Sequence, residues 1–183
     1  MKATSELMKE HEGITLMLNI MSKVSDNIQK NNVLNSDHME KIIEFLKVFA
    51  DKCHHGKEEK LLFPELERNG VPKDGGPIGV MLYEHQVGRG YIKNFVDAFN
   101  KFKEGDNKAL TQIADEMKNY VNLLTSHIHK ENIILFPMAD KVLNEKLDNE
   151  LFTKYEKLEE EEIGHGKHEE FHQLLEQLKS IYL

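Results

Sequence analysis

The chain has 183 residues, which is enough for one domain with a buried core. Its formal net charge of -8 argues against a nucleic-acid partner, because no continuous basic surface exists to neutralise phosphates. No apolar run approaches a membrane span, no hydrophobic signal core opens the chain, and Cys53 is its single cysteine, so we expect a cytoplasmic protein without an intramolecular disulfide.

Apolar residues recur at three- and four-residue steps through nearly the whole chain, which predicts helices. The first helix is expected over residues 4–31. Asp37 and Glu40 look like a capping box that opens the second helix, and the glycine- and proline-rich stretch 69–77 ends it. A third helix follows this break, and the turn EGDN separates it from a fourth.

The C-terminal part of the chain is predicted to be helical as well. A fifth helical stretch begins near Lys146 and is interrupted at Gly164 and Gly166. We therefore predict an all-α protein, with an up-down-up-down four-helix bundle over residues 1–143. The C-terminal helices of residues 144–183 are expected to pack on this bundle as part of a single domain.

An internal repeat divides the bundle into two halves. Residues 54–64 read HHGKEEKLLFP and residues 127–137 read HIHKENIILFP, so both fit H-x-x-K-E-x-x-x-L-F-P. A lone histidine precedes each copy at a similar distance, His11 by 43 residues and His85 by 42. The Leu-Phe-Pro ending of each copy predicts core packing together with a helix kink or end.

The histidine and the glutamate of each copy stand one turn apart on one helix face, so both can point at a centre between helices. That face is otherwise apolar, and an unpaired ionised carboxylate there costs roughly several kcal/mol. Metal ions would satisfy imidazoles and carboxylates together, and this donor set suits iron, manganese or zinc. Because two carboxylates can bridge two ions, we expect a dinuclear site. The predicted ligands are His11, His54, Glu58, His85, His127 and Glu131.

This order of lone histidines and His-x-x-x-Glu pairs resembles the hemerythrin-like (HHE cation-binding) family over roughly residues 5–140. The resemblance implies an up-down-up-down bundle around a non-haem di-iron centre. Members of the family bind O2, NO or peroxide at such centres, or sense iron and oxygen. The resemblance assigns one iron to His11 and His54 and the other to His85 and His127, with Glu58 and Glu131 as bridges.

The chain departs from the oxygen-carrying members of that family. They have a second histidine one turn after the third-helix histidine, where this chain has Arg89, and an aspartate one position beyond Glu131. A missing nitrogen ligand would leave an iron more open, so the resemblance implies reactivity rather than simple oxygen transport. Gly88 on the inner face is expected to leave room for an exogenous ligand or water.

Polar residues beside the repeated motif have simpler interpretations. His55 and Glu59 form a rival His-x-x-x-Glu pair on a more polar face, and we interpret them as groups on the outer surface or behind the ligands. Lys57 and Lys130 recur in the repeat and are interpreted as surface charges. Cys53 is expected to be a buried apolar thiol.

The stretch HEEFH, residues 168–172, matches the zinc-peptidase signature H-E-x-x-H. In that chemistry His168 and His172 would bind zinc and Glu169 would be the general base. The sequence offers no substrate-aligning strand, so a zinc hydrolase is kept only as a remote alternative. The plain interpretation is an amphipathic helix packed on the bundle, and a third hypothesis brings His168 or His172 to the open end of the metal site.

The sequence thus predicts a non-haem di-iron protein that binds or reacts with O2, NO or peroxide, with no nucleic acid or membrane as a partner. The alternative from a different class is an iron or oxygen sensor, or an iron storage or repair protein without turnover. Zinc or manganese would also suit the ligand set. Sequence alone does not decide the metal, the physiological ligand, the redox partner, the oligomeric state or whether the protein is an enzyme.

Overall fold

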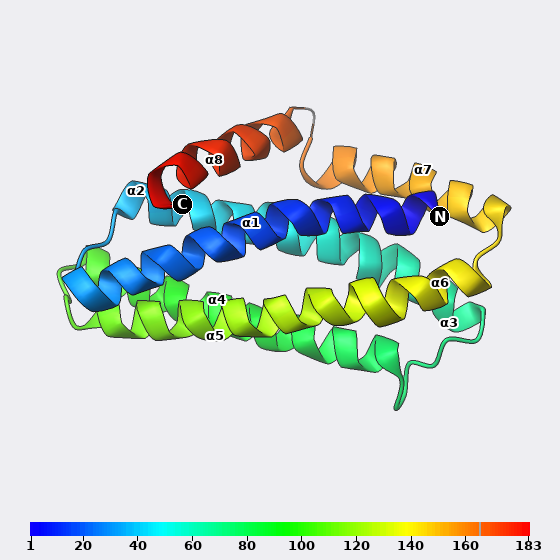
Figure 1. Cartoon of the computed structure of the whole chain (residues 1–183), viewed down its shortest axis with the longest axis horizontal. Helices are drawn as coiled ribbons and strands as arrows, with labels where there is room; N and C mark the ends of the chain where they lie inside the picture. The colour runs from blue at the N-terminus through cyan, green and yellow to red at the C-terminus, as the bar shows by residue number, and fades with distance from the viewer. Residues whose placement is uncertain (165) are drawn as a thin grey trace.

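The computed structural model describes residues 1–164 and 166–183, which contain helices and no β-strand (Figure 1). Four long helical segments run antiparallel to their neighbours in the chain, so the predicted all-α, up-down-up-down bundle is confirmed (Figure 1). The first and third segments are single helices, α1 (Lys2–Asn31) and α4 (Pro77–Lys103). Among the described residues no helix combines the length and the apolar character that crossing a bilayer requires.

The second and fourth segments change their winding along their length, and η marks their π-helical parts. The second segment consists of α2 (Ser36–Phe45), η1 (Leu46–His55), η2 (Glu58–Leu62) and α3 (Phe63–Arg68). The fourth segment consists of α5 (Ala109–Lys130), η3 (Glu131–Leu135) and α6 (Phe136–Val142).

The helices η2 and η3 occupy the same place in the two copies of the repeat, directly before Leu-Phe-Pro. The backbone N–H of Phe63 donates to the carbonyl of Glu58, and that of Phe136 to the carbonyl of Glu131, five residues back instead of four. The proline that follows each phenylalanine has no N–H to donate and stands in the first turn of the next α-helix, where none is needed. The prolines therefore accompany a change of winding, and the segment continues instead of ending.

The second segment begins where the sequence predicts, but with a different cap. The side-chain oxygen of Asn35 accepts a hydrogen bond from the backbone N–H of His38 at 3.0 Å. Asn35 is the residue before the helix, and Asp37 lies inside its first turn. The predicted capping box of Asp37 and Glu40 is therefore wrong, since another side chain satisfies the free N–H groups of the helix start.

Two more helices follow the bundle, α7 (Glu145–Glu162) and α8 (Lys167–Tyr182). In Figure 1 both lie on the side of the bundle formed by α1 and the second segment, where α7 packs on α1, η1 and η2 and α8 packs on α1 and α2. Gly164 and Gly166 between them have φ of 78° and 82°, a left-handed conformation that favours glycine. The interruption predicted at these glycines is confirmed.

The apolar core is divided in two by a belt of buried polar residues. The larger cluster fills the end of the bundle around Phe45, Phe95 and Met117 and takes in the apolar face of α8. The smaller cluster lies around Leu7 and Phe63 at the other end. The belt between them consists of His11, His54, His55, Lys57, Glu58, His85, His127 and Glu131. So many buried polar groups in one layer demand internal partners.

Candidate metal centre

Every segment of the bundle contributes to the belt. The α1 and α4 helices each bring one histidine, and the two repeat copies bring the His-x-x-x-Glu pairs. All six residues predicted from the sequence face the same interior region and are 0–2% exposed: His11, His54, Glu58, His85, His127 and Glu131. The structure therefore brings the complete predicted set together.

The donor atoms form two groups that share Glu58. Those of the first group, His11, His54, Glu58 and Glu131, all lie within 4.8 Å of one another. The second group, within the same limit, is His55, Glu58, His85 and His127. Ligands bound at ~2.0–2.2 Å lie up to about 4.4 Å apart across a metal ion, so each group has nearly the size of a metal site.

Each of the two glutamates points one oxygen at each group. Glu58 Oε1 lies 3.7 Å from His54 Nε2, and Glu58 Oε2 lies 3.4 Å from His85 Nε2. The two oxygens of Glu131 likewise lie 3.2 Å and 3.3 Å from the Nε2 atoms of one histidine in each group. Carboxylates that bridge two ions need this placement, with one oxygen for each ion.

Both oxygens of Glu58 and both of Glu131 are buried without a hydrogen-bond partner among residues 1–164 and 166–183. The same holds for Nε2 of His11. Leaving such a group unsatisfied costs about 1–3 kcal/mol, and more where it is charged. Cations between the two carboxylates would satisfy all of these atoms at once, so the donor set fits metal binding.

In the protein on its own, the two glutamates differ in protonation. Burial and the charge of Glu131 raise the pKa of Glu58 well above its ordinary value. Burial also opposes ionisation of Glu131, but the charge of His127 and the contacts with His11 and His127 hold the pKa of Glu131 well below its ordinary value. Two ionised carboxylates facing each other repel, so one of them keeps its proton. A divalent cation would remove that repulsion.

His55 is the candidate ligand that the sequence analysis missed. Its ring stacks on that of His85, with centroids 3.9 Å apart, and its Nδ1 lies 3.4 Å from Asp51 Oδ1. Successive residues of an α-helix diverge by about 100°, so His54 and His55 would not both face inward there. They lie in the π-helix η1, whose wider turn brings both to the belt. His55 is 5% exposed, so its interpretation as a group on the outer surface was wrong.

Arg89 supports the second group through hydrogen bonds to two carboxylates. Its guanidinium donates to Asp51 Oδ1 and to Glu59 Oε1, each at 2.8 Å. These two carboxylates contact Nδ1 of His55 and of His85, the latter at 2.7 Å. Arg89 therefore fixes the groups that orient two histidines, and Glu59 lies behind the ligands as the sequence analysis interpreted it. The sequence does contain a signal for His55: the adjacent pair His54-His55, in a chain that has Arg89 in place of a second histidine on the third helix.

The lysine of the first repeat copy supports the site as well. Glu10 accepts a hydrogen bond from Nδ1 of His54 at 2.7 Å and another from Nζ of Lys57. Burial raises the pKa of Glu10, but its hydrogen bond with His54 and the charges of His54 and Lys57 lower it to about 2. The ionised Glu10 holds the imidazole with Nε2 toward Glu58. Lys57 is 0% exposed, so its interpretation as a surface charge was wrong.

The second copy repeats this arrangement with Glu84. Its carboxylate accepts a hydrogen bond from Nδ1 of His127 at 2.9 Å and another from Lys130. The side chain of Lys130 is 31% exposed, so here the surface interpretation holds in part. In both halves the carboxylate directly precedes the lone histidine, so the repeated unit is Glu-His followed by His-x-x-Lys-Glu.

Residues 2–139 match the family described as the hemerythrin HHE cation binding domain. The chain belongs to this family. The match covers the four segments that form the belt and ends before α7, so the C-terminal helices lie outside the matched region.

Several curated relatives of this HHE domain are named for iron–sulfur clusters. The iron-sulfur cluster repair protein YtfE of Dickeya chrysanthemi is 34% identical over 88 residues, 47% of this chain and 40% of the relative. A probable iron-sulfur cluster repair protein of Haemophilus influenzae is 30% identical over 108 residues, 57% of this chain and 47% of the relative. An uncharacterized protein of Mycobacterium tuberculosis is 23% identical over 162 residues, 88% of this chain and 63% of the relative. The chain thus spans 40–63% of the length of these relatives.

Gly88 of the HHE domain has a packing role. A Cβ atom at this position would lie 3.4 Å from a methyl carbon of Leu124 and 3.5 Å from a ring carbon of Tyr120. These are ordinary van der Waals distances, so the α5 side chains pack directly against Gly88. The expected room for a ligand at Gly88 is filled by these α5 side chains.

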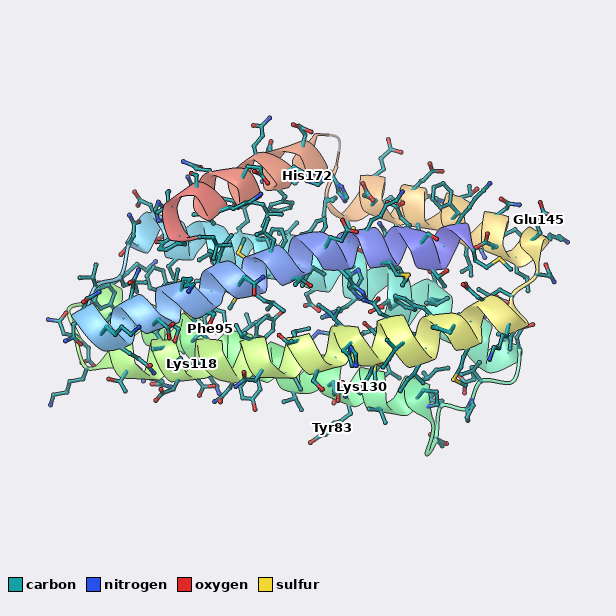
Figure 2. The ribbon with its side chains drawn as sticks, in the orientation of Figure 1. Tyr83, Phe95, Lys118, Lys130, Glu145 and His172 are labelled. Carbon is teal, nitrogen blue, oxygen red and sulfur yellow. The ribbon has the colours of Figure 1, made fainter. Side chains whose placement is uncertain are left out.

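The HEEFH stretch forms the first turns of α8 and not a zinc-peptidase site. Phe171 is buried against Phe45, with ring centroids 5.4 Å apart, as expected for an amphipathic helix on the bundle. His172, at the start of α8 (Figure 2), is exposed and lines a cavity together with His168. Among the described residues no potential metal-binding group contains both His168 and His172, and neither belongs to the two inner groups. His168 instead faces Glu159 of α7, with Nε2 and Oε1 3.3 Å apart.

Proposed function

We propose that this HHE domain binds a pair of iron ions between Glu58 and Glu131. The supporting observation is the set of four buried carboxylate oxygens without hydrogen-bond partners among the described residues, each facing a histidine nitrogen at 3.2–3.7 Å. Mixed nitrogen and oxygen donors suit iron, manganese or zinc, and the names of the relatives favour iron. The proposed ligands are those predicted from the sequence, with His55 added: His11, His54, His55, Glu58, His85, His127 and Glu131.

When bound, such a pair supplies redox chemistry and coordination positions for O2, NO or peroxide. The residues of the chain decide where a small ligand would bind. The group of His85 has three histidines because His55 replaces the nitrogen ligand that Arg89 does not provide, whereas the group of His11 and His54 has two. We therefore propose that a small ligand would bind on the side of His11 and His54. The replacement of the third-helix histidine by Arg89 had indicated the opposite side, that of His85.

The surroundings of the belt suit this role. The two apolar clusters cover it from both ends of the bundle and exclude bulk water. Glu10 and Glu84 hold the rings of His54 and His127 in place and stabilise the N–H tautomer that leaves Nε2 available for a metal.

A second candidate function is iron donation during the repair of iron–sulfur clusters. The relatives with that name favour it, although the chain matches only part of each of them. In this function the iron pair would leave the site, whereas in the first function it would stay and react.

The two functions are separated by one pair of assays on the reduced, iron-loaded protein. Consumption of peroxide or NO over many turnovers with constant iron content supports the reactive centre. A single stoichiometric uptake, followed by transfer of iron to an apo iron–sulfur protein, supports repair. Glu58→Gln is the matched control, because it keeps the size of the side chain and removes the bridging charge. Failure of the protein to retain iron at all would contradict both proposals.

A further inference from the structure

A separate cluster of metal-binding side chains lies directly outside His54. It consists of Glu10 of α1, Cys53 of η1, Glu159 of α7 and His168 of α8, whose donor atoms all lie within 4.8 Å of one another. None of the four belongs to the ligand set of the proposed iron centre. We propose that this outer cluster is a second binding site, which takes one divalent cation of borderline softness, such as Zn²⁺, Co²⁺ or Fe²⁺.

The donors of the outer cluster suit such a cation. A thiol, an imidazole and two carboxylates offer sulfur, nitrogen and oxygen, a set typical of zinc, cobalt or iron and not of calcium or magnesium. Cys53 is 0% exposed and Glu10 is 4% exposed, so they form a fixed inner wall. The side chains of Glu159 and His168 are 29% and 30% exposed and form an adjustable outer wall.

Nε2 of His168 is itself inaccessible to water and has no hydrogen-bond partner among residues 1–164 and 166–183. Its nearest charged neighbour is Glu159 Oε1 at 3.3 Å. A buried imidazole nitrogen beside a carboxylate is satisfied by a cation that binds both. This nitrogen therefore points to a ligand at the outer cluster.

A cation can reach the outer cluster from solvent. Two cavities meet at His168, one of about 300 Å³ lined by Glu10 and Phe49, and the other of about 380 Å³ lined by Lys57 and Glu159. They lie on either side of the start of α8. The HEEFH stretch thus supplies one metal-binding histidine, although not in the way that its signature indicates.

The outer cluster already attracts positive charge. Nζ of Lys57 donates to Glu10 and, at 2.8 Å, to Glu159 Oε2. Two ionised carboxylates exceed the single ammonium by one negative charge. If a divalent cation binds and the Cys53 thiol releases its proton to solvent, the sulfur–metal bond forms and the cluster becomes neutral. Lys57 can keep its hydrogen bond to Glu159 Oε2 while the cation binds Glu159 Oε1 beside His168.

The second half of the bundle is an internal control for this proposal. By the register of the repeat, the residue that corresponds to Cys53 is Ser126, and the one that corresponds to Lys57 is Lys130. No described residue of α7 or α8 groups with Glu84 in a potential metal site. The outer site therefore arises where the C-terminal helices cover the first half.

Cobalt titration tests the proposal, because Cys53 is the only cysteine of the chain and the inner ligands are nitrogen and oxygen. A thiolate-to-cobalt absorption band in the near ultraviolet can then come only from the outer site. We expect this band to saturate at one Co²⁺ per chain. Cys53→Ala should remove the band and one equivalent of cobalt, and His168→Gln should weaken binding at the outer site by about 10- to 100-fold. Glu169→Gln, an exposed carboxylate of the same helix that lines neither cavity, should leave the band unchanged.

The absence of a thiolate band at saturating cobalt would overturn the proposal. A band that reaches half-saturation at the same cobalt concentration in the wild type, in His168→Gln and in Glu159→Gln would overturn it as well. Both side chains are partly exposed, so these variants avoid a change in the buried core at Cys53. A different result is expected if the proposed iron centre between Glu58 and Glu131 does not bind metal. The cobalt bound through nitrogen and oxygen would then be missing, while the thiolate band would persist.

Discussion

The two halves of the bundle contain the same motif but bury it to different extents. Behind the first copy, the pair Glu10 and Lys57 is buried beneath α7, and Lys57 is 0% exposed. Behind the second copy, the pair Glu84 and Lys130 reaches the surface, where Figure 2 shows Lys130 on the side away from α7 and α8. The repeated sequence thus gives a buried Glu–Lys pair in the first half and a partly exposed one in the second. The helices outside the family match create this difference.

The difference extends to the proposed ligands. Burial and the charge of His11 lower the pKa of His54 to about 4, against the hydrogen bond to Glu10. Burial also acts to lower the pKa of His127, but the charge of Glu131, the hydrogen bond to Glu84 and the charge of Glu84 raise it to about 9. At neutral pH the first half therefore offers a neutral imidazole to a metal, whereas the second half must first lose a proton.

The largest effect is expected from a change at Glu58, whose carboxylate lies between the two donor groups. Glu58→Gln should lower iron affinity by more than about 100-fold, because one oxygen of Glu58 faces each group. The metal-free protein should keep its stability within about 1 kcal/mol, since Glu58 is already protonated there. Iron content and thermal unfolding with and without iron measure both effects. Glu59→Gln, behind His85, is the control and should cost only about 10-fold in affinity.

The two supporting carboxylates should differ in their effect on stability. Glu10→Ala leaves the buried ammonium of Lys57 with Glu159 alone and should cost about 3 kcal/mol of unfolding free energy. Glu84→Ala should cost about 1 kcal/mol or less, because Lys130 can be hydrated. Urea unfolding of the metal-free variants measures both. Equal losses would show that cover by α7 does not separate the halves.

A smaller effect is expected from pH. His127, with its pKa raised to about 9, stabilises the metal-free fold fully below its ordinary pKa of 6.5, and this contribution is lost as the pH rises through 9. A metal must displace the protons of His127 and Glu58, so metal affinity should rise about tenfold per pH unit for each proton released. Calorimetry of the Cys53→Ala variant with Zn²⁺ in buffers of different ionisation enthalpy counts these protons without the contribution of the outer site. Binding without proton release would contradict the assigned protonation states.

Much of the fold was predictable because its signals are local. The helical spacing of apolar residues, the break at 69–77 and the glycines at 164 and 166 mark helices and their ends without knowledge of the tertiary structure. The convergence of the six predicted ligands was predictable because the repeat restricts which histidines and glutamates can share a face.

His55 and Lys57 escaped prediction for physical reasons. The inward position of His55 depends on the π-helical winding of η1, which a periodicity of 3.6 residues does not reveal. The burial of Lys57 depends on Glu159, which is 102 residues away in the chain and comes from a helix outside the repeat. Contacts of this range are set by the packing of α7 and not by the motif itself.

The most direct test of the central claim is an anaerobic Fe²⁺ titration that measures the number of ions bound per chain. We predict two ions, retained on dilution, in a Cys53→Ala background that removes the outer site, and loss of both when Glu58→Gln is added, which keeps the helical fold. A single tightly bound ion, or a pair bound as tightly after Glu58→Gln is added, would contradict a centre bridged by Glu58 and Glu131.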